Sequence, residues 1–133
     1  DSNHNGIPEL HLSSPRYYVV LECINDELKT IYNGTGYETL LNNGAVLYTR
    51  YGGAPDHISY KYTELDSDNS IIQTTFEKYN GDMEGDYDYF LIDGEEVIKS
   101  EFDEIAEKYL NIDSDWIIWS DYWTFLFENA NRK

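Results

Sequence analysis

Alternating apolar and polar positions dominate the first two thirds of this 133-residue chain. Tyr, Val, Ile and Thr occur in short runs separated by Gly, Asn and Asp, which is typical of strands joined by turns. The stretch "RYYVVLECINDELKTIY" predicts strands at 17–24 and 28–32 with a short hairpin turn at Asn25 and Asp26. A loop over "NGTGYETLLNNG" then leads to a predicted strand at 45–51.

A second hairpin is predicted from "HISYKYTELDSDNSIIQTTFEKY". Its strands run over 57–65 and 70–79, and the polar "DSDN" forms the turn. Period-two alternation puts Ile58, Tyr60 and Tyr62 on one face. Two shorter strands are expected at 87–92 and 95–97.

An amphipathic helix is predicted after these strands. Ser100 and Asp103 fit an S-x-x-D capping box. Apolar residues follow at helical spacing, namely Phe102, Ile105, Ala106 and Tyr109. In the tail "DSDWIIWSDYWTFLFENANRK" we favour a short strand at 116–119 with Ser120 capping a second helix, and one continuous helix is the alternative.

These elements predict an α+β fold, an antiparallel β-meander with one or two C-terminal helices packed on one face. The length suits a single domain over 1–133 that can bury a core. We expect its N-terminal edge to be truncated, because no strand leads into the first loop. Cys23 is the sole cysteine, so it forms neither an internal disulfide nor a Cys-based zinc site, and we expect it to act as a small apolar strand residue.

The charge is strongly acidic. Asp and Glu number 26 against nine Lys and Arg, which gives a formal charge of −17. This balance argues against nucleic acid and anionic membranes as partners and favours cations or basic partners. No apolar run approaches the ~18 residues of a membrane span, so no span is expected.

The opening stretch "DSNHNGIPEL" carries the most specific chemistry. Oxygen-bearing side chains alternate along it, and Gly6 permits the tight turn that aims them inward. Calcium takes six to eight such oxygens. The predicted ligands are the side chains of Asp1, Asn3, Asn5 and Glu9 and the backbone carbonyl of Ile7. The alternative is an Asx-rich turn held by side-chain to backbone hydrogen bonds.

This loop is not an EF-hand. Position twelve, where an EF-hand has a bidentate Glu, is Leu12, and no helix signal follows Pro8. The chain instead enters a strand, "PELHLS", in which Glu9 and His11 alternate with leucines.

The loop resembles the short D-x-N-x-D-G-x-x-E/D loops of the FG-GAP and VCBS repeat families, in which it binds calcium. Asn5 stands where Asp is commoner. With "YFLIDGEEVIKSEFDEIAEKY", the wider chain is similar to poorly characterised secreted or lipid-anchored bacterial proteins, in which a "YDINGDGIPEL"-type loop precedes a meander. This resemblance implies an extracytoplasmic location and an architecture, but no activity.

Other candidate sites are weaker. A second acidic series could hold an ion, although a solvated hairpin loop is favoured; it comprises Asp82, Glu84, Asp86 and Asp88. The histidines are too scattered for a zinc motif and are expected in solvent or loop positions; they are His4, His11 and His57. Neither a G-x-S-x-G elbow nor a phosphate-binding loop occurs, so we expect no catalysis.

The sequence therefore favours a non-catalytic extracytoplasmic binding or interaction domain with a structural calcium loop and an unknown protein or glycan ligand. One alternative is an acidic inhibitor or immunity-type protein that masks a basic partner. A weaker alternative is a carbohydrate-binding module, for which thirteen Tyr and three Trp supply aromatic rings.

Overall fold

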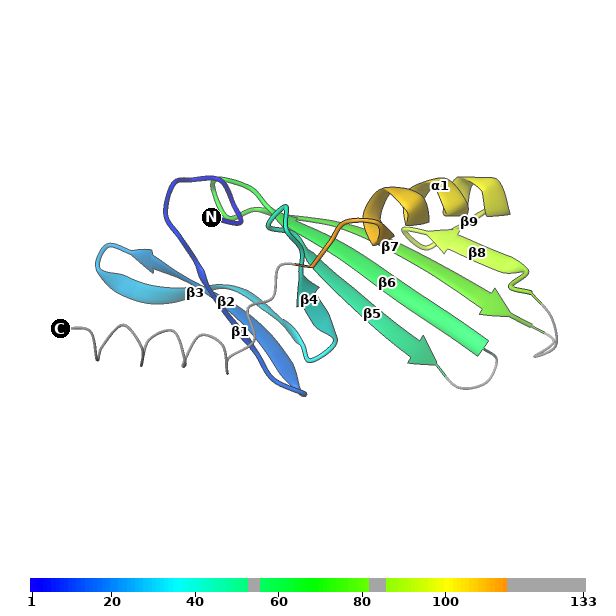
Figure 1. Ribbon diagram of the computed structural model, residues 1–133, viewed down its shortest axis with the longest axis horizontal. Helices are drawn as coiled ribbons and strands as arrows, with labels where there is room; N and C mark the ends of the chain where they lie inside the picture. The colour runs from blue at the N-terminus through cyan, green and yellow to red at the C-terminus, as the bar shows by residue number, and fades with distance from the viewer. Residues whose placement is uncertain (53–55, 82–85, 115–133) are drawn as a thin grey trace, which may run out of the picture.

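Two antiparallel sheets and one helix make up the part of the chain that the computed structural model describes, residues 1–52, 56–81 and 86–114 (Figure 1). The smaller sheet has the order β1 (Leu10–Ser13), β2 (Tyr17–Ile24) and β3 (Glu27–Thr35). The larger sheet follows chain order through β4 (Glu38–Leu40), β5 (Val46–Gly52), β6 (Asp56–Leu65), β7 (Ile71–Asn80), β8 (Tyr89–Ile92) and β9 (Glu95–Val97). The expectation of a mostly antiparallel α+β fold is confirmed.

The strands form two sheets, whereas the sequence suggested one meander. The β2–β3 hairpin turns at Asn25 and Asp26 as predicted, and both have positive φ, 53° and 64°. The segment predicted as a loop over 33–44 contains the end of β3 and all of β4. The Glu38 side chain holds this reversal, because its carboxylate accepts hydrogen bonds from the backbone N–H (2.8 Å) and hydroxyl (3.0 Å) of Thr35.

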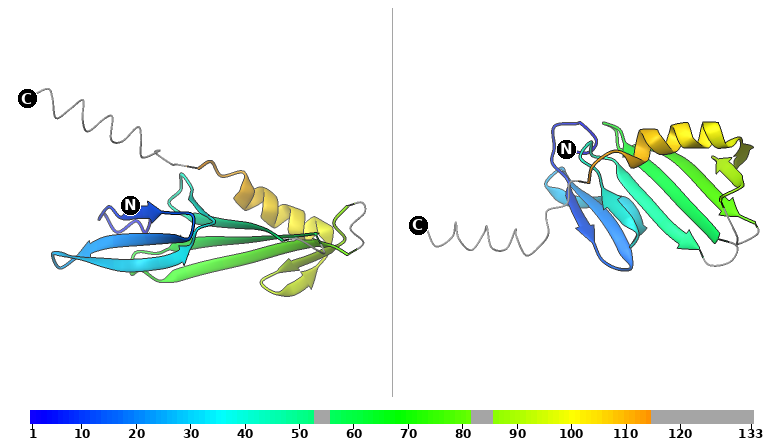
Figure 2. Two further views of the ribbon diagram at one scale, coloured as in Figure 1. Left: turned by 90° about the horizontal axis from the view of Figure 1, so that it is seen from below. Right: turned by 45° about the vertical axis from the view of Figure 1, so that its right-hand side comes forward.

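One core lies between the larger sheet and α1 (Lys99–Leu110), which packs on strands β7 and β8 (Figure 2). Tyr60 and Phe76 are cross-strand partners with stacked rings, and Phe102 of α1 is 3% exposed among them. The predicted shared face is confirmed, since this core contains Ile58, Tyr60 and Tyr62. At 12 residues, α1 is too short and too polar to cross a membrane, and the described residues contain no other candidate.

The predicted capping box is wrong. The helix begins at Lys99 with Ile98 as its N-cap, so Ser100 lies inside the first turn. Glu101, three residues after Ile98, accepts a hydrogen bond from the Ile98 N–H (3.4 Å). Asp103 instead forms an i, i+4 ion pair with Lys99 (2.6 Å). The elements predicted over 116–120 lie outside the described residues.

A second core joins the two sheets on the opposite face of the larger one. Side chains alternate along β6, so Thr63 and Leu65 point away from the face that carries Tyr62. Leu65 packs with Val46 of β5 against the smaller sheet, which contributes Tyr18, Val20 and Tyr32. Strand β6 is therefore buried on both faces around positions 62 and 63.

The buried tyrosines should make the fold sensitive to alkali. Burial, together with a hydrogen bond to Glu64, raises the pKa of Tyr62 to about 12. Burial also raises the pKa of Tyr18, Tyr32 and Tyr60 above 10. The unfolded chain therefore releases protons near pH 10 that the folded chain retains, so stability is complete below pH 10 and falls as the pH rises toward 12.

Circular dichroism and tyrosinate absorbance, recorded together from pH 9 to 12, check this prediction. We expect the last tyrosines to ionise only as the strand signal is lost. Ionisation of all thirteen tyrosines near pH 10 with the sheet intact would contradict the packing described above.

Candidate metal centre

The N-terminal loop is wound by side-chain to backbone hydrogen bonds. The Asp1 carboxylate accepts from the backbone N–H groups of Asn5 (3.0 Å) and Gly6 (2.9 Å). Asn3 Oδ1 accepts from the Asn5 N–H (3.1 Å), and Asn5 Oδ1 accepts from the Ile7 N–H (2.8 Å). Gly6 has φ 85°, which favours glycine. This winding fits the Asx-rich turn and the calcium loop equally well, so the surroundings of the loop must distinguish them.

The asparagines of the loop converge on a glutamate that the sequence analysis did not single out. Glu22 Oε2 accepts from Asn3 Nδ2 (2.7 Å) and Asn5 Nδ2 (2.8 Å). Its other oxygen accepts from Asn69 Nδ2 (3.1 Å), in the turn between β6 and β7. Asn3 is 1% exposed and Glu22 is 2% exposed. The loop is therefore fixed to the smaller sheet and to the larger one through a buried polar network.

Glu9 faces Glu22 across the β1–β2 ladder. Leu10 pairs with Leu21 and His11 with Val20, so one further step in this register sets Glu9 opposite Glu22. The Glu9 side chain has no exposed surface. Its Oε2 accepts from the Ser2 N–H (2.6 Å), whereas Oε1 is buried without a hydrogen-bond partner. Like charges directly opposite one another in a ladder are unfavourable, and burial increases that cost.

Two carboxylate oxygens can bond to each other only through a shared proton or a shared cation. Burial would raise the pKa of Glu22, but hydrogen bonds from Asn69, Asn3, Asn5 and the Glu9 carboxyl outweigh it and lower that pKa. Glu22 is therefore ionised at neutral pH, and either a proton on Glu9 or a cation between the two carboxyl groups would give Glu9 Oε1 a partner. Lys29, its cross-strand partner on β3, pairs with Glu27 instead (3.9 Å). The Asp1 α-amino group lies 3.6 Å from Glu9 Oε2.

The predicted ligands are only partly brought together. Asn3, Asn5 and Glu9 lie around Glu22, whereas the Asp1 carboxylate faces backbone N–H groups of the loop. The Ile7 side chain is exposed, and its N–H donates to Asn5. The described residues contain no group of three His, Cys, Asp or Glu side chains that could hold a metal ion. Amide and carboxylate oxygens are the ligands that calcium takes. The Asn3 and Asn5 oxygens accept from backbone N–H groups and their nitrogens face Glu22, so only after these amides turn would the set fit calcium.

Ser2, His11 and Tyr18 form a hydrogen-bonded chain beside this site. His11 Nε2 lies 2.8 Å from Ser2 Oγ, and His11 Nδ1 lies 2.7 Å from the Tyr18 hydroxyl. Burial lowers the pKa of His11 against the opposing effect of Glu9. The Ser2 N–H donates to the Glu9 carboxylate, and an anion at that place would repel the oxyanion that serine catalysis must stabilise. These hydrogen bonds are therefore better suited to fixing the N-terminal loop on β1.

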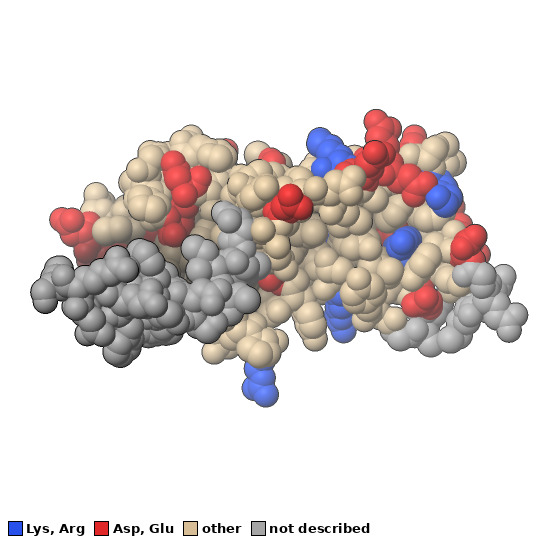
Figure 3. Space-filling model, in the orientation of Figure 1, with Lys and Arg blue, Asp and Glu red and all other residues tan. Residues whose placement is uncertain are grey.

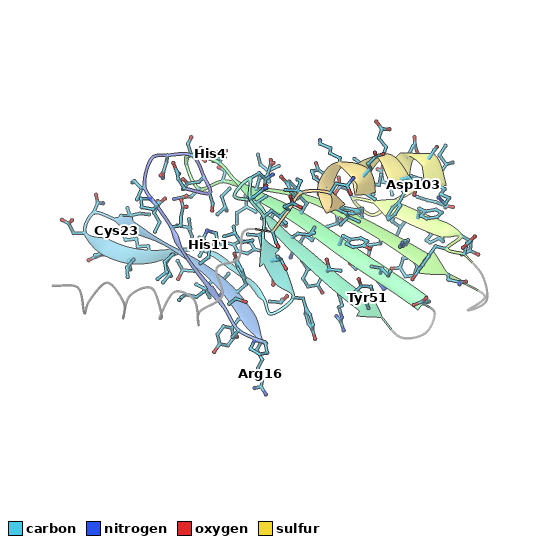
Figure 4. The ribbon with its side chains drawn as sticks, viewed as in Figure 1. His4, His11, Arg16, Cys23, Tyr51 and Asp103 are labelled. Carbon is cyan, nitrogen blue, oxygen red and sulfur yellow. The ribbon has the colours of Figure 1, made fainter. Side chains whose placement is uncertain are left out.

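The histidines differ from expectation. His4 is exposed in the N-terminal loop, but His11 is half-buried on β1 (Figure 4). His57 is half-buried on β6, stacks on Tyr79 at 3.9 Å and lies 3.1 Å from a Glu77 oxygen. The expectation of solvent or loop positions therefore holds for His4 and is wrong for the other two.

The acidic segments mostly form turns. The "DSDN" turn is confirmed: Asp66 Oδ1 accepts from the N–H groups of Asp68 and Ser70, each at 3.1 Å. Within the second acidic series, residues 82–85 lie outside the described residues. Asp88 accepts from the Gly81 N–H (3.1 Å), which is a turn contact.

A hollow of about 400 Å³ lies on the face of the larger sheet opposite α1. Its lining comes from β5, β6 and β7, namely Tyr48, Arg50, Gly52, His57, Ser59 and Glu77. Arg50 is exposed and has no carboxylate partner among the described residues. The hollow combines aromatic rings with a guanidinium group, a combination found in binding surfaces.

The surface charge gathers in part over α1 (Figure 3). The acidic residues of that helix are exposed, namely Glu101, Asp103, Glu104 and Glu107. Cys23 lies on strand β2, as expected, and is exposed there.

Comparison with known proteins gives no family for this geometry. No family model, curated protein or solved structure matches the chain.

Proposed function

We propose that this chain is a non-catalytic, extracytoplasmic binding domain whose N-terminal loop holds a structural calcium ion. The observation that carries the calcium site is Glu9 Oε1, a buried oxygen without a partner that faces the Glu22 carboxylate. A polar atom in that position indicates a missing partner, and we propose a cation rather than a proton shared with Glu22. Glu9 would hold the ion together with the amide oxygens of Asn3 and Asn5, once these amides turn from their backbone partners.

The calcium affinity expected of this loop supports an extracytoplasmic location. A loop with two amides and few carboxylates suits a dissociation constant of ~10⁻⁴ to 10⁻³ M, typical of extracellular modules. Such a site fills where free calcium is millimolar and stays empty at the much lower free calcium inside cells. The binding role is supported by the hollow on the larger sheet, which can admit one side chain or one sugar ring.

Calcium should stabilise the chain. With a dissociation constant of ~0.3 mM and ~2 mM calcium, linkage contributes about 1.2 kcal/mol, which raises the melting temperature by about 3–6 °C. Magnesium should do much less, because it requires a tighter octahedron and keeps its waters. Thermal melts in EDTA, calcium and magnesium measure these shifts.

The variant Glu9→Gln sharpens this test. In EDTA it should melt above the parent chain, because it removes one of two facing carboxylates, and calcium should no longer raise its melting temperature. Glu104→Gln removes the same charge from the exposed side of α1 and should keep the calcium response. An unchanged calcium shift in Glu9→Gln, or no shift in the parent chain, would refute the calcium site.

The extracytoplasmic location has its own test. Fractionation of cells that express the full-length protein should recover it outside the cytoplasm. Recovery from the cytosol alone would refute this part of the proposal.

A further inference from the structure

We infer that the hollow on the larger sheet binds a neutral sugar unit of a glycan, with Arg50 and Glu77 as the residues that determine its specificity. This inference rests on the binding role proposed above and names the chemistry of the ligand. It does not depend on the calcium site. The hollow lies on the face opposite α1, over strands β5, β6 and β7.

The hollow forms because small residues stand between large ones. At one level of the sheet, Ser59 of β6 pairs with Arg50 of β5 on one side and with Glu77 of β7 on the other. Two residues further along β5, Gly52 pairs with His57. Ser59 and Gly52 have little or no side chain, so the larger side chains around them enclose about 400 Å³. This volume lies near the lower end of the ~300–1,000 Å³ typical of small-ligand pockets and suits about one or two sugar rings.

Aromatic rings stand at the two ends of the hollow. Tyr48 pairs with Lys61, and His57 lies four residues from Lys61 along β6, so the two rings are attached about 13 Å apart. His57 stacks on Tyr79 with the ring centroids 3.9 Å apart, and Tyr48 has an edge contact with Tyr37 at 6.2 Å. These contacts fix both rings before a ligand binds, which lowers the entropic cost of binding. The rings also offer apolar area against which a pyranose ring can pack.

The charges of the lining favour a neutral ligand that can both donate and accept hydrogen bonds. Arg50 and Glu77 stand two strand spacings apart, about 10 Å, and form no ion pair with each other. An anion drawn to Arg50 would face Glu77 and the net charge of −17, whereas a cation drawn to Glu77 would face Arg50. An apolar ligand would leave both groups without hydrogen bonds. Sugar hydroxyls donate once and accept twice, so they can satisfy the guanidinium and the carboxylate together.

A glycan array tests the class of ligand, and isothermal titration calorimetry then measures the affinity of the oligosaccharide that binds. The array carries neutral oligosaccharides of glucose, galactose, mannose and N-acetylglucosamine, together with sialylated and uronic acid glycans. We expect neutral members to bind with a dissociation constant of ~10⁻⁵ to 10⁻³ M, because a small open site makes few contacts. The affinity should change little between low salt and ~0.5 M NaCl, since the ligand has no charge to screen.

Variants of the lining test the site itself. Arg50→Gln and Glu77→Gln should each weaken binding at least about 10-fold, because each removes a hydrogen-bonding charged group. Ser59→Leu fills the floor of the hollow and should abolish binding. Arg16→Gln removes the same charge as Arg50→Gln from the exposed turn between β1 and β2 (Figure 4), and Ser13→Leu adds the same bulk at the exposed end of β1. Both controls should keep the affinity of the parent chain.

The two charge variants distinguish a neutral ligand from a charged one. An acidic ligand would bind more tightly to Glu77→Gln, and a basic ligand would bind more tightly to Arg50→Gln; either result overturns the inference. So does binding of acidic glycans alone, binding of no glycan, or an unchanged affinity in all three variants of the lining. Circular dichroism verifies folding, and if Ser59→Leu fails to fold, the two charge variants carry the test. These failures leave the proposed function standing, because calcium-dependent melting and cell fractionation test it separately.

Discussion

Replacing Phe102 with alanine should lower the free energy of unfolding by about 3–5 kcal/mol, the usual cost of removing a buried aromatic ring. Phe102 is the fully buried residue of α1, and its ring lies 5.2 Å from Phe90 and 6.0 Å from Phe76. Ile105, Ala106 and Tyr109 of the helix also pack against this core, but each is only partly buried. Loss of Phe102 therefore leaves a cavity between α1 and strands β7 and β8.

Chemical denaturation with circular dichroism measures this loss. Leu28→Ala is the matched control, because Leu28 is a large apolar residue that is two-thirds exposed on β3 and should change stability by less than about 0.5 kcal/mol. A loss below about 1 kcal/mol for Phe102→Ala would show that the helix does not hold the core together.

Asn3→Ala should cost about 2–3 kcal/mol, even in EDTA, because hydrogen bonds to a buried charge are worth more than neutral ones. The Asn3 side chain donates to Glu22 (2.7 Å) and to Asn69 (2.6 Å). Both partners are left without that donor in the variant, and the N-terminal loop loses its link to the β6–β7 turn. The loss is measured by denaturant unfolding.

Asn33→Ala is the control for this substitution. Asn33 is exposed on β3, so its removal should alter stability by no more than about 0.5 kcal/mol. Equal effects of the two substitutions would mean that the network around Glu22 does not contribute to stability.

Strands β2 and β6 were predictable because buried side chains occur at every second position along most of their length, which gives the sequence a period of two. Strand β2 has the predicted bounds, and the turn at Asn25 and Asp26 uses two residue types that tolerate positive φ. The division into two sheets could not be predicted from this pattern. A period of two shows which side chains share a face of a strand, but not which other strand or sheet packs against that face. Strand β4 was missed because the Gly- and Asn-rich stretch around its three residues is typical of a loop, and its turn is held by the Glu38 side chain.

Of the candidate site, only the winding of the N-terminal loop could be predicted from the sequence. The spacing of Asp1, Asn3 and Asn5 predicts a wound loop, and the hydrogen bonds of the loop fit that expectation. The sequence could have predicted that Glu22 points inward, because it lies at every second position along β2 with the inward-facing Tyr18 and Val20. Its pairing with Glu9 depends on the β1–β2 register, and its bond to Asn69 joins positions 47 residues apart, so neither follows from local pattern.

Strand β1 reverses the usual rule for side chains. Glu9 and His11 point inward, whereas Leu10 is exposed. Hydrophobic patterning alone would bury Leu10 and expose Glu9. The inward placement of a carboxylate opposite another carboxylate is the feature that the proposed calcium site would explain.

Anomalous diffraction from crystals of the intact chain grown in millimolar calcium tests the central claim most directly. The account predicts one calcium peak per chain, about 2.3–2.6 Å from Glu9 Oε1. A peak confined to another acidic segment such as the Asp66–Ser70 turn, or no peak while Glu9 Oε1 is bonded through a proton to Glu22, would contradict it.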